Sequence, residues 1–309
     1  MAEQGKFQFK DLPKLLKETA VSWNDDGPWR LSAVVAYYAI LSLPGLLVII
    51  INAVGAIWGA EIVQGKVTDE IATVVGKEAA DAVKGIIENA RYGEKSTWAT
   101  ILGVGVLVFG ATGVFYHLQL SLNEVWNIKQ DPKQGIWRFL LDRAIGFGFV
   151  LIVGFLLLVS FVLSAGLSAF TDFIKSNFPD ITIYLAYVID ILLSLGVITA
   201  LFALIYRFLP DAKVQWRTVW IGALITSFLF TLGKELLGLY FGEADPASTY
   251  GAAGSIVLIL LWVSYSCLIL FFGAEFTFVF GNYYGHGIRP KKHAIRVKEE
   301  QVVVDEGEK

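Results

Sequence analysis

Charge is distributed very unevenly along this chain, and that distribution constrains its fold more than any other feature. Five uncharged runs occur, at residues 31–60, 96–123, 144–171, 218–233 and 246–274, and a sixth apolar run, Ile181–Leu209, carries only Asp190 and Arg207. A bilayer core is crossed by about 20 apolar residues in a helix. We therefore predict an all-α polytopic membrane protein with six transmembrane helices, at about 31–58, 97–122, 144–170, 181–209, 218–241 and 252–280.

The overall composition agrees with a membrane domain covering residues 31–280. Hydrophobic residues make up 55% of the 309 residues, and charged residues only 17%. A water-soluble domain of this length needs more charge to cover its surface. The single cysteine, Cys267, lies inside a predicted span, so an intrachain disulfide is excluded.

Three segments outside the predicted spans carry most of the charge. In residues 1–30, apolar side chains recur at helical spacing between lysines, which predicts an amphipathic helix on the membrane surface, with anchoring as its simplest role. Residues 61–95 show a rough helical period and predict an extracytoplasmic helical hairpin. Residues 281–309 form a charged tail, for which we expect disorder from Arg289 onward.

The positive charges predict how the chain is oriented. The two terminal segments and the loops after the second and fourth spans hold 18 Lys and Arg residues, whereas the alternate loops hold 6. By the positive-inside rule, both termini lie in the cytoplasm. The chain is therefore expected to cross the membrane several times.

An intramembrane polar site is predicted around Asp190, because an ionisable side chain in hydrocarbon is costly and is usually functional. Tyr187 and Ser194 share a helix face with Asp190. On the next, antiparallel span, Lys234 and Glu235 lie nearer the outer edge, and we expect Lys234 to approach Asp190. The alternative is a protonated Asp190 that only hydrogen-bonds Tyr187 or Ser194.

A second pair is predicted near the cytoplasmic boundary, where sequence position places Arg207 and Glu275 at similar depth. Pro44 removes a backbone donor from the first span and predicts a kink. Glycines in the second span, among them Gly110 and Gly113, predict a close approach to a neighbouring helix.

Four blocks of sequence together resemble the YihY/BrkB family of bacterial inner-membrane proteins. They are SAVVAYYAILSLPGLL (32–47), GATGVFYHLQLSLNEVW (110–126), IYRFLPDAKVQW (205–216) and YGAAGSIVLILLWVSYSCLILFFGAEF (250–276), and the likeness covers about residues 20–285. The positions that match the family pattern are Tyr37, Pro44, Asn123, Trp126, Pro210, Tyr250, Gly251, Gly254, Trp262 and Glu275.

The resemblance implies a membrane protein linked with envelope integrity and with proposed transport of lipid or other amphipathic substrates. A ribonuclease label given to this family does not fit the residues. The chain has only three histidines, lacks His/Asp clusters with metal-ligand spacing, and has no basic groove with interleaved aromatics. We expect no enzyme activity, no catalytic residue, no metal or cofactor and no nucleic-acid partner; a homo-oligomer remains open.

The sequence favours two functions. The first is a transporter or translocator of a lipid or another amphipathic, envelope-related substrate, indicated by ionisable groups at several depths and by glycine-rich helices. The second is a non-transporting structural or partner-binding protein, in which buried pairs only set helix register. A polar cavity distinguishes them, because a transporter needs one and a scaffold does not.

Overall fold

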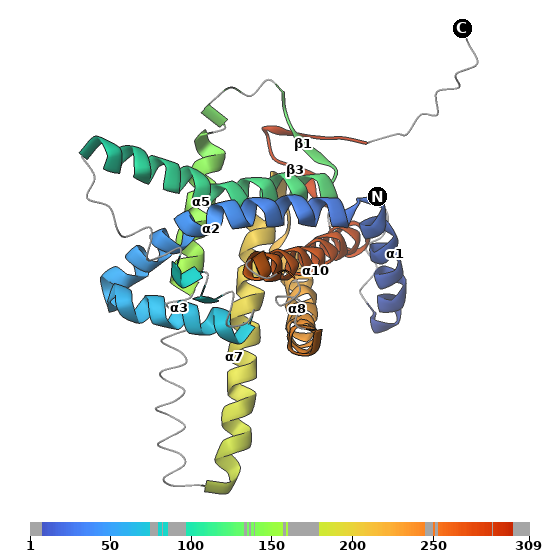
Figure 1. Ribbon diagram of the computed structural model, residues 1–309. Helices are drawn as coiled ribbons and strands as arrows, with labels where there is room; N and C mark the ends of the chain where they lie inside the picture. Colours follow the sequence, from blue (N-terminus) through green and yellow to red (C-terminus); the bar gives the residue numbers. More distant parts are fainter. Residues whose placement is uncertain are drawn as a thin grey trace.

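The computed structural model is almost entirely helical (Figure 1). It describes residues 8–74, 80–81, 83–85, 97–132, 135, 137–138, 140–156, 159, 179–244, 250, 253–285 and 287–298. After the short turn η1 (Phe9–Asp11), the helices are α1 (Leu12–Asp25), α2 (Pro28–Trp58), α3 (Ala60–Val74), α5 (Thr97–Val125), a helical segment at 140–156, α7 (Pro179–Phe208), α8 (Trp216–Ala244) and α10 (Gly254–Tyr284).

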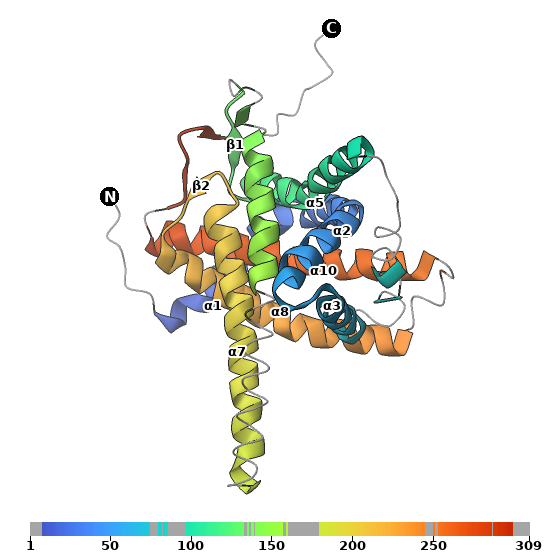
Figure 2. The same cartoon turned by 90° about the vertical axis from the view of Figure 1, so that its left-hand side faces the viewer.

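The long helices converge at one end and diverge at the other. In Figures 1 and 2, α7 runs vertically, α8 and α10 lie across Figure 2, and α2 and α5 lie across Figure 1. Two small antiparallel sheets tie together the end where α5, α7 and α10 finish and α8 begins. We call this the polar end of the molecule.

Each small sheet pairs one loop of the polar end with the C-terminal segment. β1 (Ile128–Gln130), which follows α5, pairs with β4 (Ala294–Arg296). β2 (Ala212–Lys213), between α7 and α8, pairs with β3 (Arg289–Pro290). The expected disorder from Arg289 onward is therefore wrong for residues 289–298, because partner strands far away in the sequence satisfy the backbone of this charged segment.

Four helices among the described residues are long and apolar enough to cross a membrane: Pro28–Ile57, Ile191–Phe208, Trp216–Phe241 and Gly254–Tyr284. They coincide with the first, fourth, fifth and sixth predicted spans. The second predicted span falls on α5, and the described part of the third is helical over 144–156. The count of six spans and the hairpin at 61–95 remain predictions, since most of the hairpin beyond α3 lies outside the described residues.

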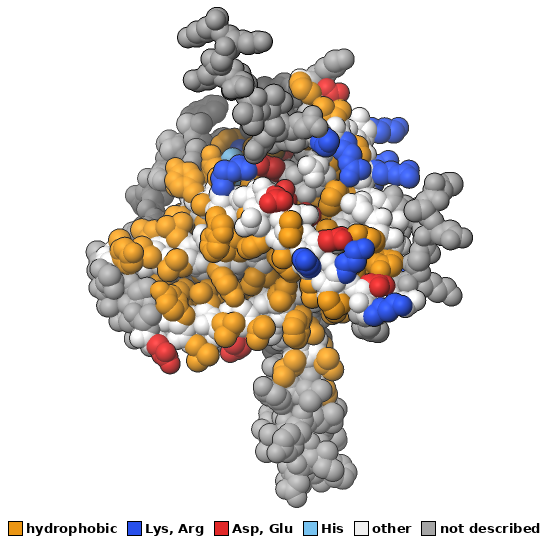
Figure 3. Space-filling model, turned by 90° about the vertical axis from the view of Figure 1, so that its right-hand side faces the viewer, with side chains coloured by type: hydrophobic (Ala, Val, Ile, Leu, Met, Phe, Trp, Pro, Cys, Tyr) orange, Lys and Arg blue, Asp and Glu red, His pale blue; other side chains and the backbone are white. Residues whose placement is uncertain are grey.

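The surface of these helices suits lipid rather than water. Large apolar side chains stay exposed along α8, for example Leu224, Phe228 and Leu232. Exposed aromatic side chains gather near the helix ends: Trp29, Trp137, Trp216 and Tyr283 at the polar end, and Tyr240 and Tyr250 at the other. Figure 3 shows apolar side chains over the centre and left of one face, with Lys and Arg at its top and right. Interfacial aromatics flanking an apolar band are typical of membrane proteins.

The predicted N-terminal helix is present as α1, and its apolar face packs against protein, while its place on the membrane surface stays a prediction. Leu15, fully buried, packs with Phe276, Val279 and Phe280 of α10. Trp23 lies edge-on to Phe272, with ring centroids 6.0 Å apart. The apolar face of α1 therefore covers the end of α10.

Small residues allow close helix crossings. On α2 and α5, the Ser42 hydroxyl accepts a hydrogen bond of 3.2 Å from the Val114 backbone N–H, and a Cβ at Gly113 would lie 3.2 Å from the Ser42 oxygen. The prediction of a close approach is thus confirmed at Gly113. The α8–α10 crossing is tighter, since a Cβ at Gly222 would lie 1.8 Å from the Thr277 hydroxyl, and one at Gly273 equally near that of Thr226.

This crossing gives a test of the fold. We expect Gly222→Ala to lower the free energy of unfolding by about 1–3 kcal/mol, because an added methyl group has no space against Thr277. The matched control is Gly238→Ala on the same helix, where the added methyl group would meet no neighbouring atom within 4 Å. Unfolding of both variants in detergent would measure the difference. Equal stability of the two would contradict the tight crossing.

Candidate functional site

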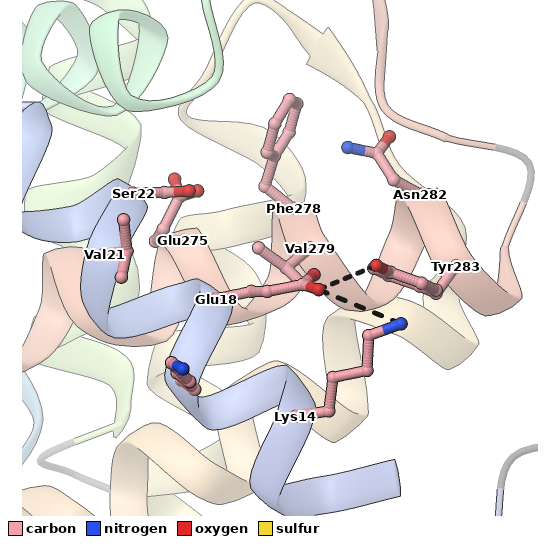
Figure 4. Close-up of a pocket in the computed structure, with 10 residues that line it drawn as sticks. Lys14, Glu18, Val21, Ser22, Glu275, Phe278, Val279, Asn282 and Tyr283 are labelled. Atoms are coloured by element: carbon pink, nitrogen blue, oxygen red, sulfur yellow. Dashed lines mark hydrogen bonds and ion pairs between the residues drawn. The ribbon is translucent and has the colours of Figure 1, made fainter.

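A polar pocket of about 650 Å³ lies between α1 and α10 near the polar end (Figure 4). Lysines and carboxylates share its walls with apolar side chains. Its lining residues are Lys14, Lys17, Glu18, Val21, Ser22, Glu275, Phe278, Val279, Asn282 and Tyr283.

Helical spacing places these residues in the pocket. On α1, Lys14, Glu18 and Ser22 recur every four residues and share one face. Every lining residue of α10 falls within 275–283, again at intervals of three or four. The two helices run in opposite directions, since Trp23 meets Phe272 while Asp11 meets Tyr284.

Polar contacts fasten the start of α1 to the end of α10. The Tyr283 hydroxyl donates to Glu18 Oε1 at 2.9 Å, and the Tyr284 hydroxyl donates to Asp11 Oδ2 at 2.8 Å. Lys14 Nζ lies 4.0 Å from Glu18 Oε1 and 5.0 Å from the centre of the Tyr283 ring. The contacts of Glu18 with Tyr283 and Lys14 are the dashed lines in Figure 4.

Glu275 lies at the opposite end of the pocket and is 2% exposed. Its Oε2 atom is fully buried and has no hydrogen-bond partner among the described residues. Its charged and polar neighbours are Asp26 and the Ser22 hydroxyl. A buried carboxyl group without a cation either takes up a proton or binds a donor, so Glu275 is a candidate binding residue.

Asp26, in the turn between α1 and α2, adds to the acidity of this region. Burial, the negative charge of Glu124 and that of Asp25 raise the pKa of Asp26 from an ordinary value of 3.8 to about 7. Glu124 itself forms an ion pair with Arg30. Asp26 also lines a second pocket, of about 700 Å³.

A separate cluster of buried polar side chains joins five segments at the polar end. Its centre is Asp211, which is 0% exposed and lies in the turn after α7. Asp211 accepts hydrogen bonds from Arg138 at 2.6 Å, His293 at 2.8 Å, Asn123 at 2.9 Å, and Gln119 and Gln130 at 3.2 Å. We call these six residues the Asp211 cluster.

Hydrogen bonds and one ion pair stabilise the buried carboxylate of Asp211. Burial disfavours the ionised form of Asp211, but the hydrogen bonds of His293, Asn123 and Gln130 and the charge of Arg138 hold its pKa below the ordinary value. Arg138 also pairs with buried Asp142 at 2.8 Å. The Asn123 Oδ1 atom accepts from the Asp211 backbone N–H at 2.7 Å, so the amide of this side chain both donates to and accepts from Asp211.

Two fully buried aromatic residues hold α10 beside this cluster. Trp126 donates its ring N–H to the Ala274 carbonyl at 2.9 Å. The Tyr206 hydroxyl donates to the Leu270 carbonyl at 2.8 Å. Both acceptors precede Glu275 by five residues or fewer. The two hydrogen bonds therefore fix the position of this part of α10 relative to α5 and α7. In the described chain, no group of three His, Cys, Asp or Glu side chains is placed to hold a metal ion.

Comparison with known proteins identifies the family of this chain. The sequence profile of the family named virulence factor BrkB matches residues 19–297. The chain belongs to this family. It is also 30% identical to a UPF0761 membrane protein of Azotobacter vinelandii, over 81% of this chain and 59% of the relative. A UPF0761 membrane protein of Pseudoalteromonas translucida is 25% identical, over 79% of this chain and 78% of the relative.

The chain spans about half the length of the first curated relatives that it matches, such as 47% of a UPF0761 membrane protein of Verminephrobacter eiseniae. None of these relatives carries an activity in its name. No solved structure matches the chain. Membership of the BrkB family therefore establishes an integral membrane protein and leaves its activity to be inferred from the site.

The family-motif positions have diverse structural roles. Asn123 and Trp126 are described above, and the Pro210 carbonyl accepts a hydrogen bond of 2.7 Å from Lys291 Nζ. Pro44 lies inside α2, Gly254 begins α10, and Trp262 packs edge-on to Phe230. Tyr37 and Tyr250 are exposed, and Gly251 lies outside the described residues.

The predicted site around Asp190 stays a prediction. The side chains of Tyr187 and Asp190 lie outside the described part of the structure. Ser194 is exposed, which does not agree with an inward-facing stripe at this residue. The first half of α7 extends away from the other labelled helices (Figures 1 and 2). Lys234 is half-buried on α8, and Glu235 is exposed.

The structure does not join Arg207 to Glu275. The Arg207 guanidinium donates to the Val214 carbonyl and lies 5.3 Å from the centre of the Trp216 ring. A local partner seven residues away therefore takes the place of the expected carboxylate. Glu275 faces α1 instead, and this contact could not be read from depth alone.

Sequence reasoning singled out Glu275 and Asn123 but missed Asp211, Arg138, Asp142 and His293 as a group. One signal was present, since Asp211 directly follows Pro210 within a family block. An acidic residue there could have been a solvated loop residue. The partners come from separate segments, so their convergence has no local sequence signature.

Removal of the central carboxylate tests the Asp211 cluster. We expect Asp211→Ala to cost about 3–5 kcal/mol of unfolding free energy, because Arg138 would be left with one fewer buried partner. Since its folded pKa is depressed, this contribution persists at neutral and mildly acid pH and disappears as pH falls through that value. Exposed Lys213→Ala is the control and should change stability by about 0.5 kcal/mol or less.

The raised pKa of Asp26 predicts that stability depends on pH in the opposite sense to the Asp211 contribution. Its raised pKa means that the folded protein holds a proton that the unfolded chain releases, so stability falls as pH rises from about 4 to about 7. Asp26→Asn removes this penalty, and we expect its melting temperature to exceed the wild-type value increasingly between pH 5 and pH 8. Exposed Glu61→Gln is the control. A pH-independent difference for Asp26→Asn would rule out the proposed burial effect.

Proposed function

We propose that this protein is a translocator of a lipid or another amphipathic, envelope-related substrate in the bacterial inner membrane, with its polar end in the cytoplasm. The observation that carries the proposal is the pocket between α1 and α10, with buried Glu275 at one end. A substrate that is apolar at one end and charged at the other matches a polar pocket at the edge of an apolar helix bundle.

The charge distribution supports this orientation. Within the described residues, Lys66, Lys84 and Lys234 are the only Lys and Arg residues on segments away from α1 and the polar end. Cytoplasmic loops of membrane proteins are enriched in Lys and Arg. Both termini then lie in the cytoplasm, and the pocket opens at the inner boundary of the bilayer.

The position of Glu275 favours binding over a purely structural role. Near the Asp211 cluster, the buried carboxylates Asp211 and Asp142 both pair with Arg138, as expected where polar groups only fix helix register, and Glu275 has no such cation among the described residues. Glu275 instead has an unused oxygen facing a second acidic residue. Such a group destabilises the empty protein and becomes favourable when a cationic or hydrogen-bond-donating ligand arrives.

A non-transporting structural or partner-binding role is the second candidate function. The Asp211 cluster supports it, because this cluster locks together α5, the 140–156 helix, the α7–α8 turn and the C-terminal segment. We propose no enzyme activity, cofactor or nucleic-acid partner for either function, and a homo-oligomer is compatible with both.

Reconstitution of the full chain tests translocation. Vesicles of phosphatidylethanolamine and phosphatidylglycerol would carry a tail-labelled fluorescent lipid, and a membrane-impermeant reductant would destroy the outer-leaflet signal. We expect vesicles with the protein to lose inner-leaflet signal over time, unlike protein-free vesicles. Translocation no faster than in protein-free vesicles, for every headgroup supplied, would overturn the proposal in favour of the structural role.

Substitutions in the pocket test whether the pocket is needed for translocation. We expect Glu275→Gln to slow translocation at least about tenfold, the effect of one charge-assisted hydrogen bond to the moving headgroup. Glu243→Gln, an exposed carboxylate on α8 away from the pocket, should translocate like the wild type. Unchanged translocation in folded Glu275→Gln would remove the pocket from the mechanism.

A further inference from the structure

We propose that the pocket between α1 and α10 binds a headgroup in which a primary ammonium and a phosphate are joined by a short linker, as in phosphatidylethanolamine. This inference rests on the function proposed above and names the substrate class of the same site. It follows from the separation of opposite charges along the pocket.

The acidic end of the pocket suits an ammonium group. Glu275 Oε2 is an unused, fully buried acceptor, the Ser22 hydroxyl lies beside the carboxylate, and Asp26 adds negative potential. A primary ammonium has three N–H donors and can satisfy several acceptors at once. It supplies the missing hydrogen bond and the missing positive charge together.

The other part of the pocket suits a phosphate. Lys14 and Lys17 line it from α1, and the Asn282 side-chain amide lines it from α10. Figure 4 shows the Lys14 and Asn282 side chains near its Tyr283 end, away from Glu275. Lys14 is mostly exposed, and its ion pair with Glu18 is long at 4.0 Å, so little energy is lost when it turns to an anion.

The spacing between the two ends fits a short linker. Lys17 precedes Ser22 by five residues, which corresponds to about 7.5 Å along a helix axis and about 140° around it. The long, flexible side chain of Lys17, which lines the pocket, can reach round the helix toward Ser22. An ammonium at Glu275 and a phosphate at Lys17 can therefore belong to one small headgroup.

The surroundings of the pocket favour a lipid as the carrier of this headgroup. Val21 lines the pocket and is 55% exposed, and Leu16 is exposed on the same helix. Tyr283, at the pocket edge, is one of the exposed aromatic residues of the polar end. An acyl chain leaving the pocket would pass over these apolar groups into the bilayer.

Other headgroups fit less well. The headgroup of phosphatidylglycerol brings no cation to Glu275 and leaves that carboxylate unpaired. Phosphatidylcholine carries a positive charge, but its quaternary ammonium has no N–H to donate to Glu275 Oε2. The order of affinity should therefore be phosphatidylethanolamine above phosphatidylcholine, with phosphatidylglycerol weakest.

Binding to the full-length, delipidated chain tests this order. Short-chain phosphatidylethanolamine, phosphatidylcholine and phosphatidylglycerol would be titrated separately, with bound lipid counted by native mass spectrometry. We expect phosphatidylethanolamine to bind at least about tenfold more tightly than phosphatidylglycerol, the ratio expected for one charge-assisted hydrogen bond. Equal affinity for all three lipids would overturn the assignment.

Three variants separate the two ends of the site. Glu275→Gln should abolish the preference for phosphatidylethanolamine, whereas Lys17→Ala should weaken all three lipids alike. Glu243→Gln is the matched control and should keep the wild-type preference. Melting curves confirm folding, and a folded Glu275→Gln that retains the full preference would overturn the ammonium assignment.

Free phosphoethanolamine carries the same two charged groups without acyl chains, so it separates a lipid from a soluble ligand. We expect it to compete far more weakly than the short-chain lipid, and equal competition would overturn the lipid assignment. Translocation is measured independently. Headgroup preference without translocation would contradict only the proposed function, and translocation without preference would contradict only this inference.

Discussion

Asp211 is the charge on which the arrangement of the helices depends. Its carboxylate, at 0% exposure, has lost all contact with water, and it is stable there only because side chains from α5, β1, residue 138 and the C-terminal segment all donate to it. Every donor brings a separate piece of chain to the same place. The helix ends therefore converge here, and the two small sheets extend the same connection through the backbone.

Glu275 shows the opposite use of a buried carboxylate. Trp126 and Tyr206 hold the backbone of α10 just before Glu275, through the carbonyls of Ala274 and Leu270. The position of Glu275 is therefore well determined, yet one of its oxygens has no partner among the described residues. Leaving a buried polar group unsatisfied costs about 1–3 kcal/mol, and a hydrogen bond from a ligand would offset this cost.

The comparison of these carboxylates shows how far sequence reasoning reaches in a membrane protein. Depth can be counted from sequence at about 1.5 Å per residue, and this placed Arg207 and Glu275 at the same level. Counting gives no information on which helices are neighbours or on how a side chain is turned. The Arg207 guanidinium donates to the Val214 carbonyl in the loop after α7, and Glu275 lies against α1. Similarly, helical spacing defined a face around Asp190, but Ser194 on that face is exposed.

The sequence by itself determined the class of the molecule, the amphipathic character of α1, four of the membrane-length helices and the close approach at Gly113, because hydrophobicity, helical period and residue size act locally. Tertiary structure decided the rest. It ordered the charged segment 289–298 by pairing it with β1 and β2, gathered the Asp211 cluster from five segments, and placed Glu275 against Asp26. Side-chain hydrogen bonds join residues up to 273 positions apart, as between Asp11 and Tyr284. Long-range partners of this kind satisfy buried charges only after the chain has folded, so no local pattern of residues records them.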